Sequence, residues 1–419
     1  MNKNIKKQRM DRSRLNIGTY TLKPYARTEK HIRELADCGI DFVVCMEDDR
    51  ETLKLFEEYG LGAIVSGVVP GWFGGDGSNA GKLSEKNPLE KYEKAAELFQ
   101  DCPAIWGIDI GDEPSAVDFP HYGDVFKLVD NAFENQFAYL NIYPNYGVKA
   151  SNSKEDIVKQ LGKANYAEYI AAYCENVDSD YICLDYYPYT AGEVGMYENF
   201  ATAADACREN NRSLWCVLQV NSYEKDVWIS LNKLRFQAFT AMAFGAENII
   251  WACYTAGWWH NQVLDKDGNK TCQYERLKQV NGEIRKLADV YMDYKRIATH
   301  FVGQKEGVNT VETFEHEVFK GVRADNDSFL VVGEFVSRKN PNGSALMILA
   351  ADDYKDCAPC SYEVTFRADN CQIAAEGING ALPIASLPDG SRAVQIKSNE
   401  VVFIRTLDIS HEYYFEKMK

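Results

Sequence analysis

The feature that most constrains the fold of this chain is an alternation of short β-rich runs with helical runs between residues 14 and 298. The first two helical runs follow a Thr or Asp capping residue and end at Gly39 and Gly60. Near-continuous apolar runs are typical of strands buried on both faces of a parallel sheet. Eight β-rich runs, bounded by Gly, Pro, Asn or Asp and near-continuously apolar in the first, fourth and eighth, predict strands at 14–20, 41–46, 62–69, 105–111, 137–143, 181–187, 213–219 and 248–254.

Eight strand-then-helix units over this length predict an α/β fold, the (β/α)8 TIM barrel, which typically takes about 250 residues. The competing architecture is a doubly wound open sheet, which usually carries a Gly-x-Gly-x-x-Gly turn after its first strand. Here the first strand runs into GTYTLKPYA, which lacks that turn. We therefore expect a catalytic barrel over residues 14–298.

From residue 299 to 419 the pattern changes to short strand-like runs such as SFLVVGEFVS, SYEVTFRA and EVVFIRTL, separated by loops such as KNPNGS and PDGS. Several short strands with frequent turn signals are typical of an antiparallel β-sandwich. The sequence therefore predicts a smaller C-terminal β-sandwich domain over 299–419.

Charge and apolar patterning bear on partners and location. Lys and Arg number 46 and Asp and Glu 62, a net charge of −16, and no basic block follows the first fourteen residues, which argues against a nucleic-acid partner. No apolar run suits a secretory signal or a membrane span. We expect a cytoplasmic protein with reduced cysteines and no membrane partner, and a homo-oligomer is left open. The lone Cys357-x-x-Cys360 pair lacks the second pair that a zinc site would want.

Active sites of such barrels lie at the C-terminal ends of the strands, so the polar residues there are the candidates. The fourth predicted strand ends in Asp112-Glu113-Pro114. Two adjacent carboxylates at the mouth suggest Glu113 as a general acid/base, with Asp112 setting its orientation or its pKa. The alternative is that these acids only stabilise the N-terminus of the next helix through its dipole.

The ends of the fifth and sixth strands carry Asn141, Asp185 and Tyr187. A carboxylate that binds hydroxyls beside rings that stack on them would suit a sugar cleft. The alternative is that alternate tyrosines of this segment pack under the helices.

The seventh strand ends at Gln219, and the eighth contains Trp251, followed in its loop by Trp258 and Trp259. Tryptophans clustered in a loop mark a binding surface, and Trp72 after the third strand adds a ring to the same rim. The glycine-rich stretch around Trp72 lacks the Lys-Ser/Thr of a phosphate-binding P-loop.

These segments resemble clan A glycoside hydrolases, and the nearest pattern is the family 42 β-galactosidase type. The run from 234 to 287 resembles the seventh helix and eighth strand of those barrels, Asp112-Glu113-Pro114 resembles their Asn-Glu-Pro, and 185–188 resembles their Asp-x-Tyr-Pro segment. The resemblance implies a glycoside hydrolase with Glu113 as proton donor and no cofactor or metal. It also implies a carbohydrate substrate, a small or exo-terminal glycoside, bound by Asn141, Tyr187, Gln219, Trp251, Trp258, Trp259 and Trp72.

The departure from that family falls at Gln219, where a nucleophilic glutamate is expected. Four hypotheses follow: Glu224 supplies the carboxylate; Asp185 acts as the base of an inverting enzyme, across a gap of about 6.5–9.5 Å; the 2-acetamido group of an N-acetylhexosaminide attacks, with Asp112-Glu113 assisting and Tyr186 holding the acetamido oxygen; or the barrel binds sugar without catalysis. A metal-dependent hydrolase is disfavoured, because His-x-His is missing after the first strand.

Overall fold

The computed structural model describes residues 9–74, 77–148, 160–255, 257–369 and 371–407. The chain forms two compact units. The first comprises Met1–Ile229 and Ala246–Asn281, and the second comprises Ser230–Gly245 and Gly282–Lys419.

The first unit is built on eight parallel strands in the order β5-β4-β3-β2-β1-β8-β7-β6. The two ends of this order meet, because Ile142 N donates to Cys183 O at 2.9 Å and Ile142 pairs with Leu184. The predicted TIM barrel is thus confirmed. The strands are β1 Asn16–Tyr20, β2 Phe42–Glu47, β3 Gly62–Ser66, β4 Ile105–Asp112, β5 Phe137–Asn141, β6 Tyr181–Tyr186, β7 Ser213–Gln219 and β8 Ala246–Ala252.

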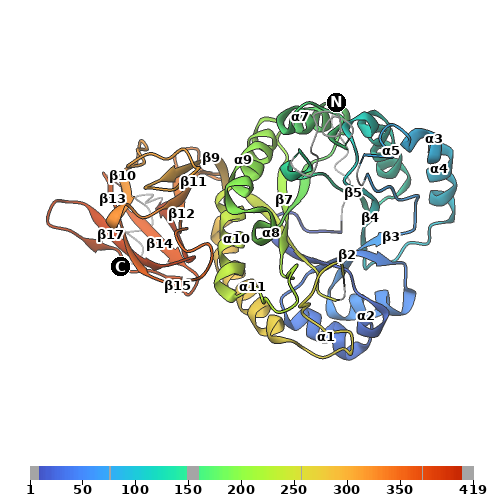
Figure 1. Ribbon diagram of the computed structural model, residues 1–419, viewed down its shortest axis with the longest axis horizontal. Helices are drawn as coiled ribbons and strands as arrows, with labels where there is room; N and C mark the ends of the chain where they lie inside the picture. Colours follow the sequence, from blue (N-terminus) through green and yellow to red (C-terminus); the bar gives the residue numbers. More distant parts are fainter. Residues whose placement is uncertain (1–8, 75–76, 149–159, 256, 370, 408–419) are drawn as a thin grey trace, which may run out of the picture. The chain divides into compact units, whose positions relative to one another are not determined.

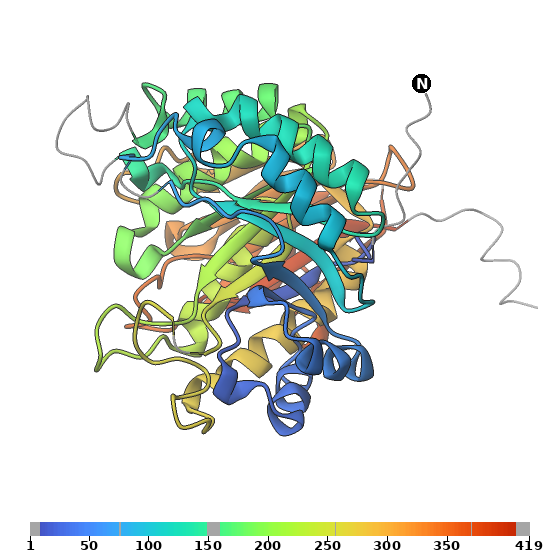
Figure 2. The same cartoon turned by 90° about the vertical axis from the view of Figure 1, so that its right-hand side faces the viewer.

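Helices surround these strands (Figures 1 and 2). Local capping explains where the first two begin: Thr28 Oγ1 accepts from His31 N, and Asp49 accepts from Glu51 N and Thr52 N. The helical segments of this unit are η1 Pro24–Ala26, α1 Glu29–Asp37, α2 Arg50–Tyr59, α3 Leu83–Lys86, α4 Leu89–Leu98, η2 Ala116–Asp118, α5 Phe119–Ala132, η3 Asn145–Val148, α7 Tyr166–Asn176, α8 Pro188–Ala191, α9 Glu193–Glu209 and the first half of α11 Cys272–Tyr291.

Aromatic rings fill much of the barrel interior. Tyr181 stacks on Trp215 with ring centroids 4.3 Å apart, and Phe137 meets the same indole edge-on at 5.6 Å. Glycine makes room for such rings: a Cβ on Gly18 would lie 2.4 Å from the Phe42 ring. The interior is therefore a packed core, which leaves the C-terminal strand ends as the place for a site.

The second unit holds two antiparallel sheets, β10-β13-β17-β16 and β15-β14-β18-β12-β11-β9. Residues of both sheets, such as Val364 on one and Ile348 on the other, share one apolar core, which confirms the predicted β-sandwich. The strands are β9 Tyr294–Val302, β10 Phe319–Ala324, β11 Leu330–Ser337, β12 Ser344–Ala350, β13 Ser361–Ala368, β14 Ile373–Gly377, β15 Gly380–Ala381, β16 Ala385–Ser386, β17 Arg392–Lys397 and β18 Val401–Thr406, with η4 at Asp325–Asp327.

Helix α10, Leu231–Ala243, belongs to this second unit, where it packs against β11 and β12. Its Arg235 donates two hydrogen bonds to the Glu283 carboxylate, at 2.8 and 2.6 Å. Strand β9 runs across residue 298, and the domain limits 14–298 and 299–419 stay predictions. In the described part of the chain, no helix combines the length and apolar character needed to cross a membrane.

Candidate active site

A pocket of about 560 Å³ opens at the C-terminal ends of the barrel strands. Seven of the residues singled out in the sequence line it together: Asp112, Glu113, Asn141, Asp185, Tyr187, Trp258 and Trp259. The other lining residues are Tyr20, Thr21, Cys45, Phe73, Tyr146, Thr190 and Ala191.

The end of β4 turns Glu113 into this pocket. Glu113 has a φ of +46°, a left-handed conformation that is uncommon outside glycine and is found at strained functional positions. Its N–H donates to Asn141 O at 2.8 Å, which joins the turn to the end of β5. The loop after β3 passes so close that a Cβ on Gly74 would lie 1.7 Å from Glu113 O. The backbone around Glu113 is therefore held from two sides.

The side chain of Asn141 links two carboxyl groups. Its Nδ2 donates to Asp112 Oδ1 at 3.0 Å and to Asp185 Oδ1 at 2.9 Å. The Tyr146 hydroxyl donates to Asp185 Oδ2 at 2.5 Å. Asp185 therefore receives more hydrogen-bond donors than the other two acids, and it is buried with 4% of its surface exposed.

Burial raises the pKa of all three carboxyl groups, but their neighbours shift the three pKa values to different extents. The pKa of Glu113 lies well above its usual range because of burial and then the charges of Asp185 and Asp112. Burial and the Asp185 charge raise the pKa of Asp112 to about 7. Burial also raises the pKa of Asp185, but hydrogen bonds from Tyr146 and Asn141 oppose that rise. The arrangement favours a proton on Glu113 and a negative charge on Asp185.

A fourth carboxyl lies deeper on β4. Asp109 Oδ2 accepts from Ser66 Oγ at 2.7 Å and from Cys45 Sγ at 3.4 Å, and burial raises the pKa of Asp109. Its charge contributes to the raised pKa of Asp112. Asp109 thus influences the pKa of a pocket-lining acid, although it is not among the described lining residues itself.

Aromatic rings form one side of the pocket. Tyr187 meets Trp259 edge-to-face with centroids 4.6 Å apart, and Tyr20 meets Trp258 at 6.0 Å. The Tyr20 hydroxyl is 2.6 Å from that of Tyr139 in the barrel core. Trp258 keeps half of its surface exposed, so its ring is open to a ligand.

Trp251, expected to bind substrate, lies elsewhere. It is fully buried, and its Nε1 donates to Asn281 Oδ1 on α11 at 2.9 Å. Successive side chains of a strand point to opposite faces, and Ile250 and Ala252 on either side of Trp251 belong to the barrel interior. Trp251 therefore packs beneath a helix, which corrects its expected place at the substrate.

Gln219 is also outside the pocket lining. Its Oε1 accepts from Tyr189 N at 3.1 Å, and its Nε2 donates to Asn221 O at 3.0 Å and to Thr190 Oγ1 at 3.4 Å. These bonds hold the segment that brings Tyr187, Thr190 and Ala191 to the pocket. The structure therefore places the Gln219 amide behind the lining residues.

Three further residues of the sequence hypotheses are outside the described pocket lining. The Trp72 carbonyl accepts from Asp112 N at 2.7 Å, but its neighbour Phe73 lines the pocket instead. Tyr186 donates to Gly192 O at 2.9 Å and so is used within its own segment rather than for an acetamido group. Glu224 is exposed and is not among the described lining residues.

Tyr146 is the main site residue that the sequence argument missed. It lies in η3, a short turn beyond the end of β5, five residues after Asn141. The rule that residues after strand ends form the site could have included it, but a tyrosine in Tyr-Pro-Asn-Tyr carries no distinctive signal of its own. Only its hydrogen bond to Asp185 identifies it.

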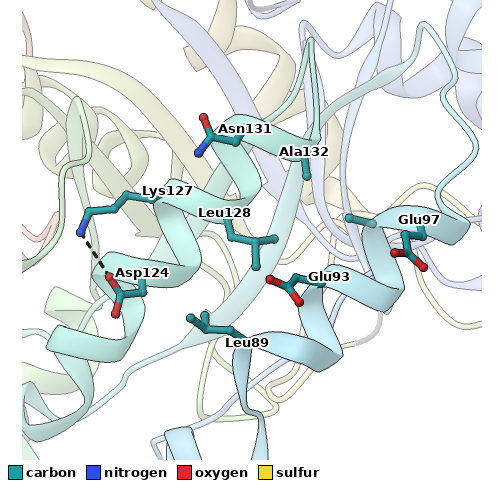
Figure 3. Close-up of a pocket in the computed structure, with 9 residues that line it drawn as sticks. Leu89, Glu93, Glu97, Asp124, Lys127, Leu128, Asn131 and Ala132 are labelled. Atoms are coloured by element: carbon teal, nitrogen blue, oxygen red, sulfur yellow. Dashed lines mark hydrogen bonds and ion pairs between the residues drawn. The ribbon is translucent and has the colours of Figure 1, made fainter.

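A second cavity, of about 670 Å³, lies between α4 and α5 (Figure 3). Glu93 and Glu97 come from α4, and the Lys127 ammonium of α5 is paired with Asp124 at 3.2 Å. Its described lining lacks a cluster of acids such as Asp112, Glu113 and Asp185 of the first pocket. Across the described ranges, no group of three or more His, Cys, Asp and Glu side chains could hold a metal ion. The strand-end pocket is therefore the candidate active site.

No protein-family model matches the chain, and no curated protein matches it. Among solved structures, a family 30 subfamily 8 xylanase from Clostridium acetobutylicum is 9% identical with a TM-score of 0.36, over 94% of this chain and 96% of that one. A putative α-L-fucosidase from Bacteroides thetaiotaomicron is 14% identical with a TM-score of 0.45, over 64% and 93%. A glucosidase from Croceicoccus marinus is 9% identical with a TM-score of 0.43, over 95% and 97%.

Proposed function

We propose that this protein is a glycoside hydrolase in which Glu113 is the general acid. The observation that carries the proposal is the meeting of Glu113 and Asp185 in one pocket with an aromatic wall, where the Asp185 charge raises the pKa of Glu113. A carboxyl group that keeps its proton near neutral pH, beside one that keeps its charge, is the combination that glycosidic bond cleavage uses.

In the proposed reaction, Glu113 donates its proton to the glycosidic oxygen as the bond from that oxygen to the anomeric carbon breaks. The leaving group departs as an alcohol, and the electron-poor sugar ring gains stabilisation from the Asp185 carboxylate. Water finally adds its hydroxyl to the anomeric carbon and returns a proton to Glu113. The sum is hydrolysis of one bond by one water molecule.

The acidic lining of the pocket supports a restriction on the charge of the sugar that binds there. Three acids line it, and no Lys, Arg or His is among the described lining residues. A uronate or a phosphorylated sugar would bring a further negative charge against these acids without a cation to pair it. We therefore propose an uncharged sugar in the pocket, in a small or exo-terminal glycoside.

A second candidate is substrate-assisted hydrolysis of a 2-acetamido sugar. It is favoured by the position of Gln219, since β7 contributes no carboxylate to the described lining. An acetamido oxygen would then attack the anomeric carbon, with Asp112 accepting the acetamido N–H.

The test is hydrolysis of a panel of aryl glycosides by the wild type and by Glu113→Gln. We expect a loss of about 10²–10⁴ in kcat/KM with a poor phenol leaving group, and a much smaller loss with dinitrophenol, which departs without a proton. Glu93→Gln, an exposed acid of α4, is the control and should match the wild type. Equal rates for wild type and Glu113→Gln would refute the acid role.

The same panel separates the candidates. Activity confined to 2-acetamido sugars, with inhibition by a sugar thiazoline, supports substrate assistance, whereas equal activity on plain glycosides excludes it. If the wild type binds sugars but hydrolyses none of them, the result supports the remaining alternative, a barrel that binds carbohydrate without catalysis.

A further inference from the structure

Large apolar side chains are exposed on the loops around the pocket. Phe73 after β3 is 57% exposed and Trp258 after β8 is 50% exposed, and both line the pocket. Tyr223 and Trp228 in the loop after β7 are 67% and 38% exposed, and neither is among the lining residues. Soluble proteins rarely keep several large rings in water at one place unless a ligand covers them.

The loop with Tyr223 and Trp228 is joined to the loop with Trp258. Ser222 and His260 form an antiparallel pair, with Ser222 N donating to His260 O at 3.0 Å and His260 N donating to Ser222 O at 2.9 Å. Asn261 Nδ2 donates to Val227 O at 2.6 Å. The two loops are therefore joined by hydrogen bonds, and the exposed rings of the first belong to a segment bound to the loop that carries Trp258 into the pocket lining.

We propose that Tyr223 and Trp228 bind additional sugar units of an oligosaccharide whose scissile unit lies at Glu113 and Asp185. This inference rests on the proposed function. The faces of a pyranose ring are apolar and stack on exposed aromatic rings, while its hydroxyls need polar partners at the edges. Glu224, Lys225 and Asp226 stand exposed between the two rings and supply such groups.

The same charged residues argue against a protein or a membrane as the occupant. A protein interface core is depleted of charged residues, and here three consecutive charged side chains interrupt the apolar surface. A neutral oligosaccharide tolerates this alternation because each of its rings presents both an apolar face and a polar edge. The hydrogen bonds of this loop to the loop of Trp258, which lines the pocket, make the substrate itself the occupant.

The experiment compares Tyr223→Ala, Trp228→Ala and the double variant on two kinds of substrate. The first is the best aryl monoglycoside of the panel, and the second is the best of xylotetraose, cellotetraose and chitotetraose. We expect each ring to cost about tenfold in kcat/KM for the tetrasaccharide, mainly through KM, and the loss to be at least tenfold larger than for the aryl monoglycoside. Leu98→Ala, which removes a side chain 81% exposed on α4, is the control and should change neither.

An equal loss on both substrates, or no loss on either, overturns the proposal and leaves the proposed function standing. Conversion of a dimer into a monomer by the variants, measured by light scattering, also overturns it, because the rings would then bind a second copy. If the wild type hydrolyses no glycoside, the proposed function has failed. Calorimetric titration with the three tetrasaccharides then tests sugar binding by Tyr223 and Trp228 separately. Binding that weakens about tenfold in each variant supports the proposal, and unchanged or absent binding refutes it.

Discussion

The Tyr146 hydroxyl donates a hydrogen bond of 2.5 Å to Asp185 Oδ2. Asn141 Nδ2 donates to the other oxygen of the same carboxylate at 2.9 Å. Both bonds favour the charged form of Asp185, and the Asp185 charge in turn raises the pKa of Glu113. A tyrosine that is distant from the proton donor in sequence therefore helps to keep the proton on it.

Tyr146→Phe should move the acidic limb of the pH profile of kcat/KM to higher pH. That limb reports protonation of Asp185, whose pKa rises when the donor is lost. A hydrogen bond to a charged group contributes about 1.5–3 kcal/mol, which corresponds to about one to two pH units. The profile of an aryl glycoside measures this, with Tyr92→Phe on α4 as control. An unshifted limb with a uniformly lower rate would mean that Tyr146 acts only through packing.

Asp112→Asn should make the protein more stable at pH 8 and not at pH 4. The pKa of Asp112 is about 7 in the folded protein and about 3.9 in an unfolded chain, so the folded state binds the extra proton between these values. Stability from this group is thus fully present below about pH 4 and is lost as the pH rises through 7. Asparagine at position 112 avoids that loss, and its side-chain oxygen can still accept the hydrogen bond from Asn141.

Thermal unfolding at pH 4, 6 and 8 tests this prediction, with a melting temperature expected to rise by a few degrees at pH 8, by less at pH 6 and not at pH 4. A gain that is equal at all three pH values would show that the charge of Asp112 is not its cause. Activity of Asp112→Asn should fall at the same time, since the group sits beside the general acid.

Gly74→Ala should displace the backbone of Glu113, because the added Cβ would lie 1.7 Å from Glu113 O. Overpacking of this kind costs about 1–3 kcal/mol of stability, and a misplaced acid loses rate as well. We expect kcat to fall at least about tenfold. Gly71→Ala in the same loop is the matched control, since a Cβ there meets nothing within 4 Å. Equal kinetics for the two variants would contradict the predicted displacement.

Gln219→Glu should destabilise the protein without creating a nucleophile. The Gln219 amide donates to Asn221 O, and a carboxylate in its place would face that carbonyl without a hydrogen, at a cost of about 1–3 kcal/mol. A lower melting temperature at pH 8 than at pH 5 is expected, and Gln219→Met separates the loss of hydrogen bonds from the effect of charge. Mass spectrometry after treatment with a 2-fluoro glycoside should find no adduct, and an adduct at position 219 would show that this side chain reaches the anomeric carbon.

Much of the fold could be predicted because strand and helix signals are local. Each of the eight predicted strands overlaps a strand of the barrel, and Thr28, Asp49 and Gly60 act as helix caps where the pattern placed them. The strand-end rule then collects Asp112, Glu113, Asn141 and Asp185 in one pocket. Their catalytic and binding roles stay predictions.

The sequence by itself determined the order of strands and helices, the change to a β-sandwich and the strand ends at which polar residues cluster. Only the tertiary structure decided which side chains face the pocket. Trp251 and Trp258 have the same side chain, but the first lies under α11 and the second at the pocket, because alternation along β8 and the path of the loop set their directions. The proton on Glu113 was likewise undecided, since it depends on Tyr146 and Asp185, which come together only across neighbouring strand ends.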